Sequence, residues 1–304
     1  MRGVDFSYPA DYSALVCCIN ELCEAYSFVW RGCIGKSTCG RELPYLRLGE
    51  GDKRILYIGC HHAMEWITSW ILLRYLYDLA EAYVSCRTCF GAEPEYLLKT
   101  RSIYVIPMLN PDGTELQQHG EDSENPMRER LISMNGGSED FSRWQANARG
   151  VDLNHNYNSG FDEYKKLEAE AGILDGAPGK YSGAFPESEP ESSALCAFIR
   201  AMGDVRLLLT FHTQGQEIFG DCRGYYPPHG YAIGRQLARY CGYRLCRPTG
   251  GAAYGGLKDW YIEEFDSPAY TIECGRGENP LPIDNGILIY AELCRMLFRA
   301  PLLV

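Results

Sequence analysis

RILYIGCHHAMEW, residues 54–66, passes from a strand-like apolar run into an amphipathic helix. His62 and Glu65 therefore stand where a strand gives way to a helix. An imidazole and a carboxylate three residues apart at such a point can converge on one cation, as Zn²⁺ with nitrogen and oxygen ligands requires. A capping pair at a helix start is the alternative for an isolated H-x-x-E pattern, so other parts of the chain must decide.

Two later segments supply further candidates for the same site. Residues 205–212 form a near-continuous apolar run, typical of a buried strand, that ends in His212. Residues 267–275 repeat the pattern with a carboxylate, Glu273, which is costly to bury unless it meets a charge. Open α/β folds place their sites at the carboxyl ends of strands. Two histidines, one ligand carboxylate and one free carboxylate make up a hydrolytic zinc site with an open position for water.

At this point the chain resembles the zinc carboxypeptidase family, the carboxypeptidase A-like metallopeptidases. The resemblance runs from about Ile34 to about Pro282, and six motifs occur in the family's order: Gly59–Trp66, Asn110-Pro111-Asp112-Gly113, Gly150–Asn156, His212, Gly255–Trp260 and Glu273. Local forms such as Thr271–Gly275 and Asn279–Ile283 look like one bacterial branch, the γ-D-glutamyl-meso-diaminopimelate peptidases, which cut peptidoglycan stem peptides.

The resemblance implies an α/β fold with a mixed, mostly parallel central sheet flanked by helices. We expect one domain over residues 1–304, with residues 1–44 as an N-terminal helix and strand extension packed on it. The resemblance also implies one zinc ion per chain, held by His62, Glu65 and His212, with Glu273 as the general base. His61 competes with His62 for the ligand role, but the family's spacing selects His62 and leaves His61 in the wall of the site.

One departure from the family concerns the cation beside the metal. Relatives carry an arginine just after a tryptophan in this region, whereas Trp144 is followed here by Gln145. Arg149 and Arg143 are the available replacements. We predict Arg149 as the catalytic cation because it adjoins the Asp-Leu-Asn motif, with a plain surface arginine as the alternative.

Two further departures concern the substrate. Typical relatives have Asn-Arg, which clamps a terminal carboxylate, where this chain has Asn154-His155; a neutral packed histidine is the alternative to a ligand-binding one. Lys258 occupies a position at the base of the family's pocket for the residue after the scissile bond. A lysine there suits the distal carboxylate of diaminopimelate, while pairing with Asp259 in solvent is the alternative. We predict substrate contacts for Asn154, His155, Lys258 and Tyr254.

Composition agrees with an enzyme that has one large core. The chain has 304 residues and 46% hydrophobic content, with no linker, repeat or low-complexity run. Its net charge of −11 argues against nucleic acid or an anionic membrane as a partner. Residues 1–5 lack a signal-peptide pattern, and no apolar run approaches a membrane span, so we expect a cytoplasmic protein. The sequence does not indicate an oligomeric state.

Fourteen cysteines would suggest disulfides in a small secreted protein, but this chain is not small. Several, such as Cys60 and Cys274, lie in apolar segments and resemble small core residues. The C-x-x-C pair Cys86 and Cys89 has no second pair beside it, so two free thiols at a helix end are favoured over a redox or metal pair. We expect a reducing cytosol.

A pass along the chain predicts alternating helices and strands. We expect helices at 12–26, 63–84, 192–202 and 287–298, and strands at 43–48, 55–59 and 103–108. Asn110–Gly113 reads as a turn, Ser188–Glu191 has capping-box spacing, and residues 119–147 read as an irregular surface excursion over the site.

These observations favour a zinc peptidase that cuts stem peptides at the γ-D-Glu–meso-diaminopimelate bond. A zinc carboxypeptidase that removes an acidic C-terminal residue is one alternative, and a small-molecule deacylase of the aspartoacylase type is a second. A catalytically inactive peptidoglycan-binding module is a third, but a binder would have no reason to keep Glu273 beside a complete ligand set.

Overall fold

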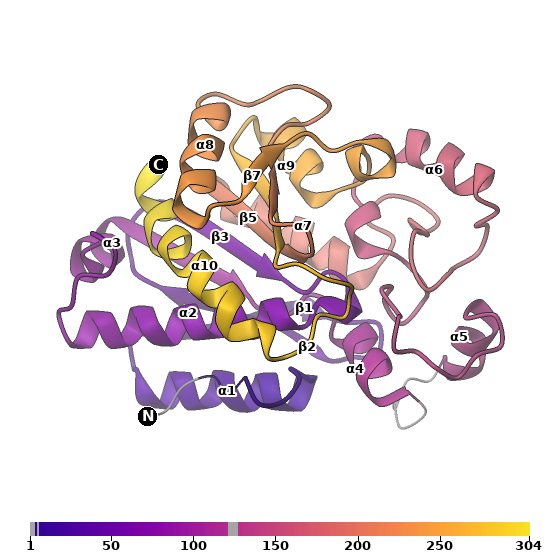
Figure 1. The fold of residues 1–304 in the computed structure, drawn as a ribbon, viewed down its shortest axis with the longest axis horizontal. Helices are drawn as coiled ribbons and strands as arrows, with labels where there is room; N and C mark the ends of the chain where they lie inside the picture. Colours follow the sequence, from indigo (N-terminus) through magenta and orange to yellow (C-terminus); the bar gives the residue numbers. More distant parts are fainter. Residues whose placement is uncertain (1–3, 5, 121–126) are drawn as a thin grey trace.

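The strands of the chain form one eight-stranded sheet, in the order β1-β2-β4-β3-β5-β8-β6-β7 (Figure 1). The computed structural model describes residues 4, 6–120 and 127–304. The strands are β1 (Trp30–Lys36), β2 (Glu42–Leu48), β3 (Lys53–Gly59), β4 (Arg101–Ile106), β5 (Val205–Thr213), β6 (Glu217–Phe219), β7 (Arg244–Cys246) and β8 (Ala269–Cys274).

The centre of the sheet is parallel and its flanks are mixed. Strands β4, β3, β5 and β8 run in one direction. Antiparallel pairs join this centre to β2 and β1 on one side and to β6 on the other, and β7 lies parallel to β6. The predicted mixed, mostly parallel sheet in a single α/β domain is confirmed.

Helices cover both faces because neighbouring side chains of a buried strand point to opposite faces. Tyr57 and Leu209 belong to the core beneath α1, α2, α8 and α10, whereas Leu56 and Leu208 pack in the core with α7 and α9. The helices are α1 (Tyr12–Ala25), α2 (Ile67–Val84), α3 (Pro94–Thr100), α4 (Pro111–His119), α5 (Arg128–Met134), α6 (Phe161–Glu170), α7 (Pro190–Met202), α8 (Gly230–Cys241), α9 (Leu257–Phe265) and α10 (Asn285–Arg299).

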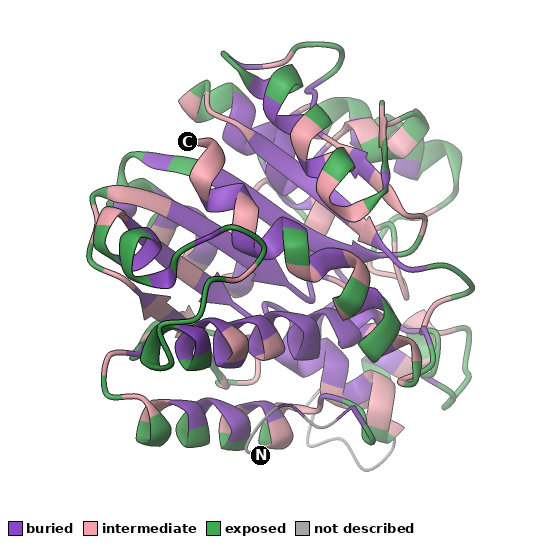
Figure 2. Cartoon of the chain, turned by 60° about the vertical axis from the view of Figure 1, so that its left-hand side comes forward, coloured by how far each residue is buried: buried purple, intermediate pink, exposed green. Residues whose placement is uncertain are grey.

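Helix α2 is buried around most of its circumference. One side faces the sheet, and α1 and α10 lie against it from outside (Figures 1 and 2). This explains its nearly continuous run of buried side chains, from Ile67 to Ala82, since a helix that is apolar all round belongs inside a protein. Among the described residues, no helix combines the length and apolar character that a membrane span needs.

The candidate residues gather at the carboxyl edge of the parallel strands. His62 follows the end of β3, and His212 and Glu273 occupy paired positions near the ends of β5 and β8. Such an edge is where open α/β sheets place ligands. The strand order, rather than closeness in the sequence, brings these segments together.

Three local predictions need correction. A short 3₁₀ turn, Ala63–Glu65, precedes α2, which begins only at Ile67. Asn110–Gly113 is the start of α4 rather than a free turn, because the Asn110 side chain accepts the Gly113 N–H and Pro111 occupies the first helical position. The capping box is wrong: Ser188 lies before the cap of α7, which makes no side-chain capping bond.

The excursion predicted at 119–147 is only partly irregular. It contains the helix α5, and residues 121–126 lie outside the described part of the chain. Phe141 and Trp144 are buried and form a small apolar cluster with Leu116 and Leu131. The segment therefore carries a core of its own, which its polar composition concealed.

Candidate metal centre and active site

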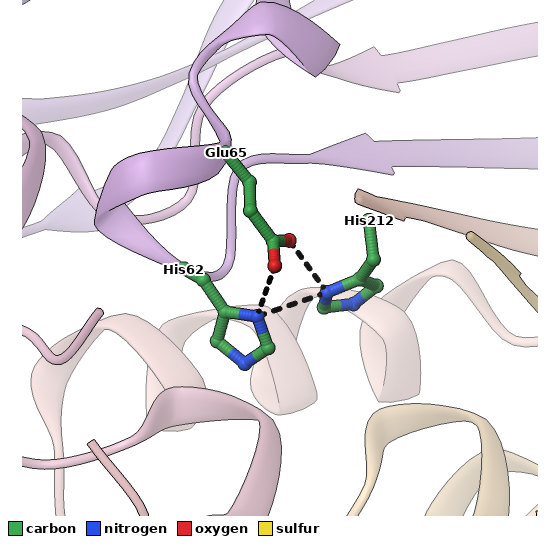
Figure 3. Close-up of side chains that lie close together, drawn as sticks. All are labelled: His62, Glu65 and His212. Carbon is green, nitrogen blue, oxygen red and sulfur yellow. Dashed lines mark hydrogen bonds and ion pairs between the residues drawn. The ribbon is translucent and has the colours of Figure 1, made fainter. Parts of the chain in front are cut away.

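Three side chains converge at the carboxyl edge of the sheet: His62, Glu65 and His212 (Figure 3). One oxygen of Glu65 lies 2.9 Å from Nδ1 of His62, and the other lies 3.0 Å from Nδ1 of His212. The two Nδ1 atoms are 3.2 Å apart. All three residues thus direct a potential ligand atom toward one point.

The spacing and charge of this group fit a zinc ion. Zinc–nitrogen bonds of about 2.0–2.1 Å at tetrahedral angles place two ligand nitrogens about 3.3 Å apart, close to the separation found here. Two facing ring nitrogens cannot both donate to each other, whereas a cation between them uses the lone pairs of both. The carboxylate adds the negative charge that a divalent cation needs.

The charges around Glu65 keep its carboxyl group ionised, as a metal ligand must be. Burial opposes ionisation of Glu65, but His62 and then His212 outweigh it and lower its pKa to about 2. Burial also disfavours a charged His62, but Glu65 and Asp152 raise its pKa well above the ordinary value. Binding of a metal would displace the proton from that ring.

The loop that carries His62 is fixed by neighbours on two other segments. The N–H of Cys60 donates to Thr68 Oγ1 at 2.9 Å. The side-chain amide of Asn110 donates to the carbonyl of His61 at 3.0 Å. The helix cap that begins α4 thus also holds the loop that carries the candidate ligand His62.

Asp152 and Asn279 support the candidate ligands, although the sequence alone indicated neither role. Nε2 of His62 lies 3.1 Å from Oδ1 of Asp152, a carboxylate–histidine pair that orients a metal-binding ring. The amide of Asn279 donates to Glu65 at 3.3 Å. The available signal for Asp152 was its place between Val151 and Leu153, because an acid between two buried apolar residues needs a partner.

His61, the competing ligand candidate, points elsewhere. Its Nε2 lies 3.0 Å from the hydroxyl of Tyr157, and its Nδ1 lies 3.2 Å from Oγ1 of Thr210. Both ring nitrogens are therefore engaged away from the point where His62, Glu65 and His212 meet.

Glu273, the predicted base, lies in register with His212 on the neighbouring strand. Burial, followed by the charge of Glu65, raises the pKa of its carboxyl group to about 8. No hydrogen bond to its side chain is found within the described residues, so this carboxyl group remains available to a substrate or water.

Comparison with known proteins agrees with this geometry. The profile of the zinc carboxypeptidase family matches residues 17–292. The chain belongs to the zinc carboxypeptidase family. It is a zinc metallopeptidase, and its His-Glu-His group fits the single zinc of that family.

Gamma-D-glutamyl-L-diamino acid endopeptidase 1 of Lysinibacillus sphaericus is 33% identical to this chain over 282 residues, which are 93% of this chain and 69% of that protein. Among solved structures, bovine thrombin-activatable fibrinolysis inhibitor superposes with a TM-score of 0.75 at 20% identity, covering 97% of both chains. Murein-tripeptide amidase of Escherichia coli O157 superposes with a TM-score of 0.52 at 20% identity, covering 87% of this chain and 91% of the other. The structural similarities show a shared fold.

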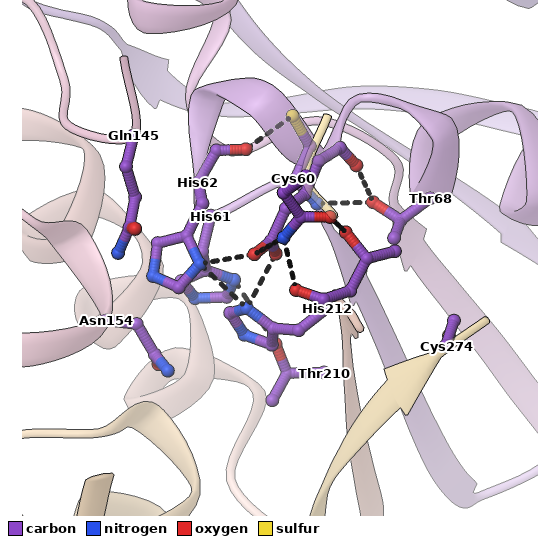
Figure 4. Close-up of polar contacts among 12 residues, drawn as sticks. Cys60, His61, His62, Thr68, Gln145, Asn154, Thr210, His212 and Cys274 are labelled. Atoms are coloured by element: carbon purple, nitrogen blue, oxygen red, sulfur yellow. Dashed lines mark hydrogen bonds and ion pairs between the residues drawn. The ribbon is translucent and has the colours of Figure 1, made fainter. Parts of the chain in front are cut away.

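Asn154 and His155 lie beside the metal centre of this zinc carboxypeptidase-family protein. Figure 4 shows Asn154 and Gln145 on the same side of His62. His155 is a packed ring: its Nδ1–H donates to the carbonyl of Tyr254 at 2.8 Å, and it stacks on Tyr164 at 3.9 Å between centroids. Burial lowers its pKa, so the neutral form is favoured, as in the packed alternative. The substrate contacts of Asn154, His155 and Tyr254 stay predictions.

Lys258 is buried rather than solvated. Its ammonium donates to Oδ1 of Asp259 and to the main-chain carbonyl of Asp221, each at 2.5 Å. The pairing with Asp259 that stood as the alternative is therefore present, but away from solvent. An ammonium has three donors, so one remains for a further partner.

Arg149 contacts a different part of the molecule. Its guanidinium lies 3.8 Å from Glu189, and its side chain is 44% exposed. Arg143 donates to the carbonyl of Asn279, the residue whose amide contacts Glu65. Gln145 donates to Oδ2 of Asp152 at 2.6 Å and so reaches the outer side of His62. The catalytic role of Arg149 stays a prediction, and no recorded contact links it to the candidate ligands.

Proposed function

We propose that this zinc metallopeptidase hydrolyses peptidoglycan stem peptides at the γ-D-Glu–meso-diaminopimelate bond. The observation that carries the proposal is the 33% identity, over nearly the whole chain, with an endopeptidase named for γ-D-glutamyl-L-diamino acid bonds. The fold shared with a murein-tripeptide amidase is compatible with it. The metal centre supplies the hydrolytic chemistry, and the residues around it supply the selectivity.

His62, Glu65 and His212 would hold the zinc ion. When bound there, zinc makes water more acidic and polarises the carbonyl of the scissile bond. Glu273, beside His212 and free of competing hydrogen bonds among the described residues, takes a proton from the attacking water and delivers it to the leaving amine. A divalent cation at the neighbouring site would favour the ionised form of this carboxyl group, which is the form that accepts a proton.

The substrate side lacks a fixed positive clamp for a terminal carboxylate. His155, which stands where typical relatives have arginine, is packed on Tyr164 and favoured in its neutral form. A peptide that continues beyond the residue after the scissile bond should then bind as well as one that ends at that residue. This supports an endopeptidase over a strict carboxypeptidase.

Lys258 and Asp221 support a diamino acid on the leaving side. The far end of meso-diaminopimelate carries both an ammonium and a carboxylate. Lys258 has one free donor for the carboxylate, and Oδ1 of Asp221 is a buried carboxylate oxygen with no hydrogen-bond partner among the described residues. The two groups are neighbours, because Lys258 bonds to the main-chain carbonyl of Asp221.

Incubation with L-Ala-γ-D-Glu-meso-diaminopimelate, followed by mass spectrometry, tests the proposal. We expect L-Ala-D-Glu and free diaminopimelate, with similar rates for the peptide and for its C-terminally amidated form. Cleavage that requires the free carboxylate would instead indicate a carboxypeptidase that removes an acidic residue. Absence of cleavage of either peptide by zinc-loaded protein would contradict the proposed substrate.

We also propose a cytoplasmic location. Cysteines along the described part of the chain, including the C-x-x-C pair Cys86 and Cys89, are free thiols. Free thiols in such number persist in a reducing compartment. Mass spectrometry of protein from cells, alkylated before lysis, should find these thiols reduced.

A further inference from the structure

A buried chain of hydrogen bonds runs from the candidate ligand His212 away from the metal centre (Figure 4). Nε2 of His212 lies 3.2 Å from Oγ1 of Thr210, which lies 3.2 Å from Nδ1 of His61. Nε2 of His61 lies 3.0 Å from the hydroxyl of Tyr157. All four side chains are at most 1% exposed, so solvent cannot replace these bonds.

Metal binding would make all the hydrogen bonds in this series run in one direction, from donor to acceptor. When Nδ1 of His212 binds a cation, the neutral ring carries its proton on Nε2, which must donate to Thr210. The hydroxyl of Thr210 has one hydrogen, which it then donates to Nδ1 of His61. The proton of His61 is therefore on Nε2 and donates to Tyr157. His212, Thr210 and His61 thus each donate one hydrogen bond, all in the direction that leads away from the cation.

The backbone sets the positions of His212, Thr210 and His61 relative to one another. Thr210 and His212 are two residues apart on β5, so their side chains point to the same face of the strand. His61 follows β3, the neighbouring strand, and its ring stacks on that of His212 at 5.2 Å between centroids and an angle of 30°. The two rings are thus held by both packing and a shared hydroxyl.

The two candidate ligand histidines differ in what supports them. His62 has a carboxylate, Asp152, on its far nitrogen. His212 has only a neutral hydroxyl there, and a hydroxyl can rotate to another acceptor unless something fixes its hydrogen. The Nδ1 of His61 is an acceptor in the required place.

We propose that Thr210 and His61 are positioning residues that hold the ring of His212 with Nδ1 toward the zinc ion. Thr210 accepts from the ligand ring, and His61 fixes the hydroxyl in the orientation that lets it accept. Loss of such an outer partner typically lowers metal affinity about 10- to 100-fold.

Zinc affinity of Thr210→Val, measured by competition with a chelator, tests the proposal. We expect Kd to rise about 10- to 100-fold and Thr210→Ser to restore it, since serine keeps the hydroxyl. Thr271→Val is the matched control: Thr271 pairs with Thr210 on the adjacent strand, is also buried, and bonds to neither histidine. The absorption spectrum of cobalt-loaded protein should change in Thr210→Val but not in Thr271→Val.

A second pair of variants separates the bond from the packing, and covers the case in which Thr210→Val does not fold. His61→Asn keeps an acceptor near the position of Nδ1, whereas His61→Leu removes it. We expect His61→Leu to weaken zinc binding and His61→Asn to recover part of the loss, with similar unfolding temperatures of the metal-free proteins. Wild-type zinc affinity in Thr210→Val or His61→Leu would overturn the proposal, as would equal losses in Thr210→Val and Thr271→Val.

Discussion

Two buried networks of acids differ in how their charge is satisfied. In the network of the metal centre, Glu65 and Asp152 face two imidazoles whose nitrogens also face each other. In the network between the turn after β1 and α7, Asp112 accepts from Arg41, from Ser37 and from the N–H of Cys39. Glu191, in this second network, accepts from the N–H of Thr38 and from Asn147.

The difference indicates which network needs an ion. Every carboxylate oxygen of Asp112 and Glu191 already has a donor from the protein, including a guanidinium. Among the described residues, no arginine or lysine side chain contacts Glu65 or Asp152; Lys180 reaches Asp152 only through its main-chain N–H. The facing nitrogens of His62 and His212 leave a position for a cation. The second network therefore joins segments of the fold, whereas the first is completed by zinc.

Removal of a predicted ligand should break the first network most completely. His212→Ala should lose most of the approximately one zinc per chain, and with it nearly all peptidase activity. Metal content can be measured by atomic absorption after dialysis, with Arg130→Ala, at an exposed residue paired with Asp175, as the control. Full zinc occupancy in His212→Ala would show that the ligand set is wrong.

Glu273→Gln should separate chemistry from metal binding. The amide cannot accept a proton, so turnover should fall about 10²- to 10⁴-fold or more while the zinc content stays normal. Steady-state kinetics beside metal analysis measures both. Near-normal turnover would exclude Glu273 as the base.

The second network should respond to pH rather than to metal. Burial, with Asp112 and Glu189 nearby, raises the pKa of Glu191 to about 7 from 4.5. The unfolded chain therefore releases this proton at a lower pH than the folded one, so the contribution of Glu191 to stability falls between pH 4.5 and 7. Below pH 4.5 Glu191 is protonated in both the folded and the unfolded chain, so it does not lower the free energy of unfolding. Above pH 7 it is ionised in both, and the free energy of unfolding is lower by at most about 3 kcal/mol.

Glu191→Gln should therefore match the wild type near pH 4 and be more stable near pH 8. Urea unfolding with a chelator present measures this difference without interference from zinc. Glu264 is a control of opposite sign, because the hydrogen bond from Arg200 lowers its pKa. A Glu191→Gln difference that does not change with pH would show that Glu191 ionises normally in the folded protein.

Lys258 and Asp259 form a buried ion pair outside these two networks. Comparison of two substrates shows whether Lys258 also binds substrate or only stabilises the fold. If the free donor of Lys258 meets the distal carboxylate of diaminopimelate, Lys258→Met should lower kcat/KM for the diaminopimelate peptide about 10- to 150-fold, equivalent to about 1.5–3 kcal/mol. A peptide with lysine in that position has no distal carboxylate and should be little affected. Comparison of the two substrates on one variant cancels any loss from leaving Asp259 unpaired. Equal losses would make the pair purely structural.

Local pattern was enough for the central elements of the fold. The apolar run of β5 and its terminal His212 could be read directly, because a buried strand has few polar residues and each is conspicuous. The family resemblance supplied what periodicity lacked, namely the order of the strands. The start of α7 was misplaced because Pro190 begins the helix two residues before the expected start at Ser192.

The supports of the site were harder to predict because they come from distant segments. Asp152 and Asn279 contact His62 and Glu65 across 90 and 214 positions of sequence. Nothing local marks Thr210 as the partner of His61, since a threonine is common in a buried strand. Arg149 was chosen for its place in the sequence, whereas its recorded ion pair, with Glu189, lies outside the candidate ligand set.

The pairing of His212 with Glu273 has a consequence for how the chain can change. The two residues sit opposite each other on adjacent parallel strands, about 4.8 Å apart, so backbone hydrogen bonds set the distance between them. Loss or gain of one residue within β8 would turn Glu273 to the opposite face of the sheet. Length changes in this enzyme should therefore accumulate in its loops, while the strands that carry a ligand and the base tolerate substitution but not insertion or deletion.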